Sequence, residues 1–185
     1  MNFDFGLEQK FARFGDSLDV KDGTVISGYA SLFGAVDQGN DVVAPGAYAA
    51  SLKDLSAKNA QVKMLWQHNP AEPIGIWDEV REDAKGLWVK GRLLDSVEKG
   101  REARALIEAG AIDGLSIGYR TKKSVKNSTG QRLLTELELW EVSLVTFPML
   151  PSARIAGKSD ETELDCVLRD MAAALQGARA DLARR

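Results

Sequence analysis

Short segments of alternating apolar and polar residues, separated by turn residues, dominate the central part of this chain. The predicted strands cover residues 24–33, 62–68, 73–81, 86–94, 114–120 and 132–147, the last either one long strand or a bent pair. Apolar residues at helical spacing predict helices over 45–58 and 97–109, the second ending at Gly110, and 122–130 is a predicted polar loop. About seven strands at irregular intervals argue against a doubly wound parallel sheet. We therefore expect an α+β fold, a small, mostly antiparallel β-barrel surrounded by helices.

The two ends of the chain differ from this central domain, which we place at residues 23–156. Residues 1–22 form a predicted N-terminal arm, in which four apolar residues at helical spacing allow either a short amphipathic helix or a loosely attached arm. Residues 157–185 form a predicted helical tail, an amphipathic C-terminal helix that begins after a hinge at Gly157. Its apolar seam consists of Leu164, Leu168, Met171, Leu175, Ala178 and Leu182. This helix either packs back on its own domain or binds a partner.

Composition excludes several classes of function. The 185 residues are 44% hydrophobic and 28% charged with a net charge of −3, and no basic patch stands out, so nucleic acid is not an expected partner. No apolar run approaches the roughly 18 residues that span a bilayer, and the N-terminus lacks the apolar core of a signal peptide. One cysteine rules out an internal disulfide. The sequence therefore predicts a cytosolic protein with no membrane association.

His68 is the only histidine of the chain, and it ends the predicted strand over 62–68. Alternation places His68 on the same strand face as Met64 and Trp66. With one histidine and one cysteine, Cys166, the chain cannot assemble the usual His/Cys zinc site, and we expect neither a metal nor a cofactor. If the protein uses an imidazole as a base, His68 is that base. The alternative is a structural histidine whose ring caps an apolar face.

A base needs a group to activate, and Ser116 in the strand over 114–120 offers a hydroxyl. Ser116 and Gly118 lie on one face of that strand, where the missing side chain of Gly118 would let a substrate backbone approach. A serine hydroxyl becomes a useful nucleophile when an imidazole accepts its proton. The alternative is a solvent-facing hydroxyl, and composition alone offers other serines, namely Ser31, Ser51, Ser96 and Ser143.

Glu141 lies among apolar residues on one face of the last strand. A carboxylate on such a face is costly to bury unless it is paired, and protonated His68 would be a suitable partner. A third group of this kind would orient the imidazole. The alternatives are a bulge near Trp140 that turns Glu141 outward, or a salt bridge with one of the many Arg and Lys residues.

Two other groupings are weaker. Asp37 and Asp41 flank a loop that could hold a cation, but a turn rich in Asp, Gly and Asn needs no metal. Cys166 could act as a nucleophile with His68, but it lies in the predicted tail helix, outside the central domain. A small, half-buried thiol is the simpler interpretation of that cysteine.

Seven segments, in order from about residue 24 to 155, resemble the prohead proteases of tailed phages. These segments are Gly28–Phe33, Asp41–Tyr48, Leu65–Asn69, Pro73–Gly75, Gly86–Val89, Gly114–Tyr119 and Glu141–Pro148. The resemblance implies a serine endopeptidase with a fold similar to the herpesvirus assembly protease. It also implies His68 and Ser116 as the catalytic pair, and Glu141 as the third catalytic residue.

The resemblance further implies the biological setting. The substrates would be the N-terminal scaffold segment of the major capsid protein and the protease itself, cut inside assembling procapsids in the cytoplasm of a bacterial host. The resemblance extends to the related proteins of phage-like gene transfer particles, so this chain could belong to such a particle. A homodimer, or self-cleavage near Gly157, would offer a means of control. The alternative function is a catalytically silent capsid assembly or scaffolding factor.

Overall fold

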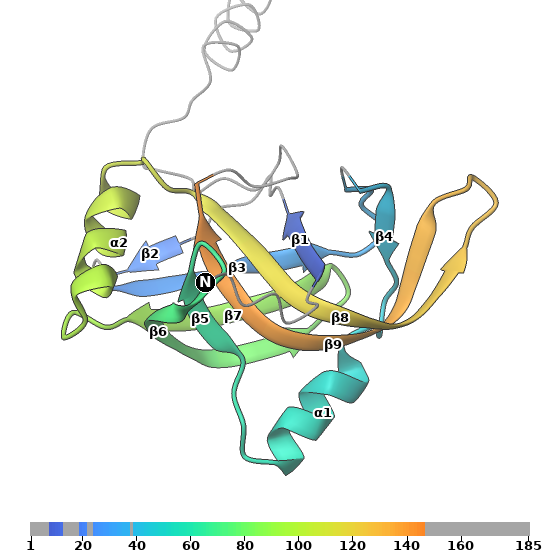
Figure 1. Cartoon of the computed structure of the whole chain (residues 1–185), viewed down its shortest axis with the longest axis horizontal. Helices are drawn as coiled ribbons and strands as arrows, with labels where there is room; N and C mark the ends of the chain where they lie inside the picture. Colours follow the sequence, from blue (N-terminus) through green and yellow to red (C-terminus); the bar gives the residue numbers. More distant parts are fainter. Residues whose placement is uncertain (1–7, 13–18, 22–23, 38, 147–185) are drawn as a thin grey trace, which may run out of the picture.

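The computed structural model describes residues 8–12, 19–21, 24–37 and 39–146, and these form one curled, nine-stranded mixed sheet with two helices (Figure 1). The strands are β1 (Glu8–Ala12), β2 (Asp19–Lys21), β3 (Val25–Leu32), β4 (Asp41–Val43), β5 (Lys63–Trp66), β6 (Asn69–Glu82), β7 (Gly86–Leu93), β8 (Gly114–Lys126) and β9 (Arg132–Val145). The helices are α1 (Ala49–Ala57) and α2 (Glu98–Glu108).

The sheet has the strand order β1-β8-β9-β5-β6-β7-β3-β2, with β4 pairing to β9 outside this path. Only the β4–β9 and β5–β9 pairs are parallel among the described strands, so the predicted α+β class and mostly antiparallel pairing are confirmed. The described strands do not form a closed barrel surrounded by helices, because β1 and β2 end the order without pairing to each other. The predicted C-terminal helix lies outside the described residues.

The core fills the concave side of the curled sheet, and simple alternation builds much of it. In β7, Leu87, Val89 and Leu93 are buried, whereas Lys90 and Arg92 are exposed between them. Each fully buried Leu, Ile or Val side chain stabilises the fold by roughly 1.5–3 kcal/mol. The largest fully buried side chains are Tyr48, Tyr119, Ile26, Met64, Ile74, Leu87, Leu115, Ile117, Leu134, Leu137 and Leu139.

Helix α2 covers one end of the sheet and is amphipathic, with Gly100, Ala103 and Ile107 buried. Its C-terminus follows the sequence prediction, because Gly110 adopts a left-handed φ of 70°. The N–H of Gly110 then donates to the carbonyl of Ile107, and that of Ala111 to the carbonyl of Leu106. This Schellman motif satisfies the last carbonyls of the helix.

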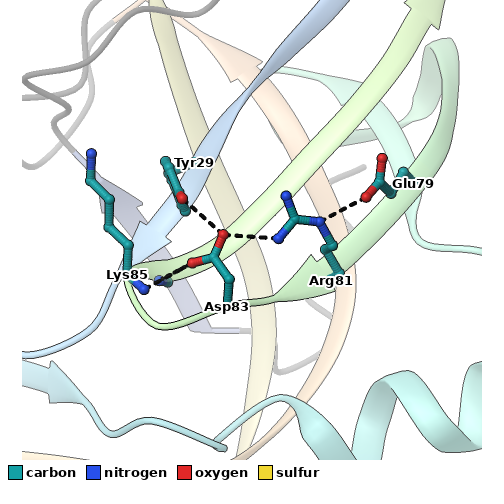
Figure 2. Close-up of polar contacts among 6 residues, drawn as sticks. Tyr29, Glu79, Arg81, Asp83 and Lys85 are labelled. Atoms are coloured by element: carbon teal, nitrogen blue, oxygen red, sulfur yellow. Dashed lines mark hydrogen bonds and ion pairs between the residues drawn. The ribbon is translucent and has the colours of Figure 1, made fainter.

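The turn between β6 and β7 is organised by Asp83, as Figure 2 shows. Its carboxylate accepts hydrogen bonds from the backbone N–H of Lys85 (2.8 Å) and Gly86 (3.1 Å), from the Tyr29 hydroxyl (2.8 Å) and from Arg81 (2.9 Å). Partial burial opposes ionisation of Asp83, but these donors lower its pKa to about 2. The turn is thereby tied to β3 through Tyr29.

The predicted N-terminal arm contains two strands of this sheet, β1 and β2, so the helical alternative is wrong where the arm is described. Strand β1 pairs antiparallel with β8 and places Phe11 opposite Ser116. Residues 122–126, predicted as loop, extend β8 into a long hairpin with β9. In the described residues, no helix is long and apolar enough to cross a membrane.

Candidate active site

His68 lies in a tight turn and not at the end of a strand, which corrects the sequence prediction. Strand β5 ends at Trp66, and Trp66 pairs with Asn69 across a two-residue turn formed by Gln67 and His68. Both turn residues are left-handed, with φ of 50° and 61°, the conformation of a type I′ turn. Register shifts on both sides of Leu65 break the alternation on which the strand prediction depended.

This turn brings His68 over β9 and into contact with Glu141. The two side chains meet at 2.5 Å between His68 Nδ1 and Glu141 Oε1, and their exposed fractions are 9% and 6%. The expected pairing of the buried carboxylate with the only histidine is therefore present. The predicted bulge is present too, because the β8–β9 register skips Trp140, but it turns Trp140 outward and leaves Glu141 inside.

Ser116 lies on the neighbouring strand β8, on the same face as this pair. The register places Ser116 opposite Ser143 and Gly118 opposite Glu141. Directly opposite residues of an antiparallel pair have Cβ atoms about 4.5–5.5 Å apart. Since the Ser143 hydroxyl lies 3.2 Å from the backbone nitrogen of His68, the Ser116 side chain lies beside the His68 turn.

Gly118 has a different role from the predicted approach of a substrate backbone. A Cβ atom at Gly118 would lie 2.1 Å from Glu141 Oε1 and 2.8 Å from Glu141 Cδ. The space left by the missing side chain is filled by the Glu141 carboxylate. Gly118 therefore allows the carboxylate to lie flat against β8, where it reaches His68.

Ser143 was one serine among several in the sequence, and the structure places it at the centre of this site. Its hydroxyl donates to Glu141 Oε2 (2.5 Å) and accepts the backbone N–H of His68 (3.2 Å). The spacing of two residues from Glu141 was a usable signal, because it puts both side chains on one strand face.

The arrangement favours one tautomer of a neutral His68. A carboxylate at Nδ1 accepts a hydrogen bond, so the ring proton is held on Nδ1 and Nε2 is left as the basic nitrogen. An imidazole oriented in this way can take the proton of a serine hydroxyl and stabilise the positive charge that it gains. Ser116 and Ser143 have no exposed surface.

The weaker sequence candidates do not join this site. Asp37 and Asp41 form a hydrogen-bonded turn, and the Asp41 carboxylate binds Arg132 Nε at 2.9 Å. No group of three potential metal ligands occurs among the described residues. Cys166 lies outside them. A groove of about 510 Å³ between α1 and β9 has none of the three predicted catalytic residues in its lining.

A buried carboxylate in contact with the only histidine of the chain, with a serine on the adjacent strand, has the composition of a serine hydrolase site. A comparison with known protein families matches residues 15–166 to the caudovirus prohead serine proteases. The chain belongs to this family.

Two characterised relatives are similar in sequence. The prohead protease of Enterobacteria phage HK97 is 34% identical over 135 residues, which is 71% of this chain and 59% of the relative. The capsid polyprotein of Pseudomonas phage PAJU2 is 35% identical over 163 residues, 82% of this chain and 21% of that protein. The chain therefore spans less than two thirds of the length of either relative.

One solved structure supports the fold. The bacteriophage T4 capsid assembly protease gp21 superposes with a TM-score of 0.61 at 18% identity, covering 77% of this chain and 98% of that one. The varicella-zoster virus protease superposes with a TM-score of only 0.40 at 13% identity, covering 69% and 60%. The second score is too low to establish a shared fold, so the herpesvirus-like fold stays a prediction.

Proposed function

We propose that this protein is a serine endopeptidase of capsid maturation that uses Ser116, His68 and Glu141. The contact of 2.5 Å between His68 and Glu141, beside a serine on the adjacent strand, carries the proposal. Membership of the prohead serine protease family supports the same activity. A structural role alone would not require that a buried carboxylate be directed at the only imidazole of the chain.

In the proposed mechanism, the Ser116 hydroxyl oxygen attacks the scissile carbonyl while His68 Nε2 accepts its proton. His68 then protonates the leaving amine, which departs and leaves an acyl-enzyme. A water molecule activated by the same imidazole hydrolyses this ester and regenerates the serine. Glu141 accepts the hydrogen bond from Nδ1–H of His68 throughout and stabilises the imidazolium form. Backbone N–H groups stabilise the oxyanion.

The proposed substrate is the N-terminal scaffold segment of the major capsid protein. The capsid polyprotein of phage PAJU2 supports a capsid substrate, because a segment similar to this chain makes up 21% of that protein. The protease would act inside assembling procapsids in the host cytoplasm. Self-cleavage and a homodimer are further predictions from the family resemblance.

Co-expression with the cognate major capsid protein tests the proposal. Intact mass measures the capsid protein made with wild type, with Ser116→Ala and with Ser124→Ala, a control that removes an exposed hydroxyl farther along β8. We expect loss of the N-terminal segment with wild type and Ser124→Ala only.

Each other outcome has a defined meaning. Trimming by Ser116→Ala would exclude Ser116 as the nucleophile. No trimming with any variant, in a protein that still enters capsids, would favour the silent assembly factor over the protease.

A further inference from the structure

The hydroxyl of Ser143 forms hydrogen bonds with both members of the His68–Glu141 pair. Its oxygen has no solvent exposure and lies in β9, two residues after Glu141. The hydroxyl donates its hydrogen to Glu141 Oε2 at 2.5 Å. It also accepts the backbone N–H of His68 at 3.2 Å. One group therefore contacts both the carboxylate and the backbone that carries the imidazole.

The contact with Glu141 fixes how the carboxylate is oriented. One carboxylate oxygen faces His68 Nδ1, and the other faces the Ser143 hydroxyl. A carboxylate held at both oxygens cannot rotate about its terminal bond without breaking a charge-assisted hydrogen bond. A buried carboxylate oxygen that loses its donor also bears an unfavourable desolvation cost.

The contact with His68 holds a backbone conformation that is unfavourable by itself. Gln67 and His68 are both left-handed, which costs a non-glycine residue roughly 1 kcal/mol or more. Hydrogen bonds to β9 maintain the turn. Gln67 donates its N–H to the Leu144 carbonyl (3.0 Å) and its side-chain amide to Thr146 (2.6 Å), and His68 donates its N–H to Ser143.

We propose that Ser143 is a positioning residue for the His68–Glu141 pair, an inference that depends on the proposed function for its catalytic consequence. By holding the second oxygen of Glu141 and the turn of His68 together, Ser143 keeps the ring proton on Nδ1. Nε2 is then the basic nitrogen that can accept the proton of Ser116. Ser143 acts through His68 and Glu141 and does not react with the substrate.

The single histidine allows a direct test in the full-length protein. With ¹⁵N-labelled histidine, NMR reports the ring nitrogens of His68 without overlap, whether or not the protein cleaves anything. We expect one Nδ1–H tautomer with a strongly deshielded proton in wild type. In Ser143→Ala we expect mixed tautomers and loss of that proton signal. On purified capsid precursor, kcat should fall about 10- to 100-fold with KM nearly unchanged.

Ser51→Ala is the matched control. Ser51 is also a buried serine whose hydroxyl accepts a backbone N–H of β9, that of Leu139 at 2.9 Å, but it does not contact the pair. We expect it to leave the His68 spectrum and kcat unchanged. If Ser143→Ala unfolds, Ser143→Thr and Ser143→Val replace it, because they have the same shape and differ only in the hydroxyl. The Ser143→Thr variant should retain the Nδ1–H signal of His68, and the Ser143→Val variant should lose it.

An unchanged His68 spectrum in Ser143→Ala, or equal spectra in the Thr and Val variants, would overturn the proposal. So would a Ser51→Ala spectrum that changes in the same way, since the effect would then belong to β9 in general. Failure of the proposed function has a different signature. In that case the wild-type protein leaves the capsid precursor intact, while the NMR spectrum of His68 still changes in Ser143→Ala.

Discussion

Replacing Gly118 by alanine probes the space on which the His68–Glu141 contact depends. The added Cβ would lie 2.1 Å from Glu141 Oε1, 2.8 Å from its Cδ and 2.9 Å from its Cγ, distances that real atoms do not tolerate. Glu141 is buried, and each of its oxygens is in a 2.5 Å hydrogen bond. The carboxylate must therefore move away from β8 and lose at least one of these contacts.

The expected size of the effect follows from these contacts. A hydrogen bond to a charged group contributes about 1.5–3 kcal/mol, and about 1.4 kcal/mol in a barrier is tenfold in rate. Loss of one contact thus predicts a 10- to 100-fold lower rate, while loss of the correct tautomer in a serine protease costs about 10⁴-fold. We expect kcat to fall between these limits. Overpacking should also lower stability by about 1–3 kcal/mol.

The assay is the rate of trimming of the capsid precursor, with melting temperature measured on the same samples. Wild-type trimming by Gly118→Ala would refute the view that Gly118 accommodates the Glu141 carboxylate.

Two further predictions concern stability. Because the folded pKa of Asp83 is lowered to about 2, its stabilising effect is present above the ordinary carboxyl pKa and is lost as pH falls from about 4 to 2. In urea titrations Asp83→Asn should be less stable than wild type near neutral pH but not near pH 2, and a constant difference would contradict this account. Arg132→Ala removes the partner of the buried Asp41 carboxylate and should cost about 1–3 kcal/mol. Arg104→Ala, whose partners Glu108 and Asp95 are both exposed, should lower stability much less than Arg132→Ala, and equal losses would refute the role of burial.

Local chemistry explains which parts of the fold were predictable. The alternation of β7 and the helix end at Gly110 depend on neighbours within a few residues, and each was visible in the sequence. The short strands β1, β2 and β4 were missed. Three to five residues carry too little pattern, and these strands are defined by partners far along the chain.

By itself, the sequence determined the α+β class and the family resemblance, and it predicted a catalytic role for His68, Ser116 and Glu141. The presence of a single histidine and the order of the matching segments along the chain were enough to select these three residues. Only the tertiary structure decided how these residues are held. The left-handed turn of His68, the space at Gly118 and the role of Ser143 depend on register between segments that lie more than 20 residues apart. Periodicity along the chain carries no information about such a register, because pairing between distant strands sets it.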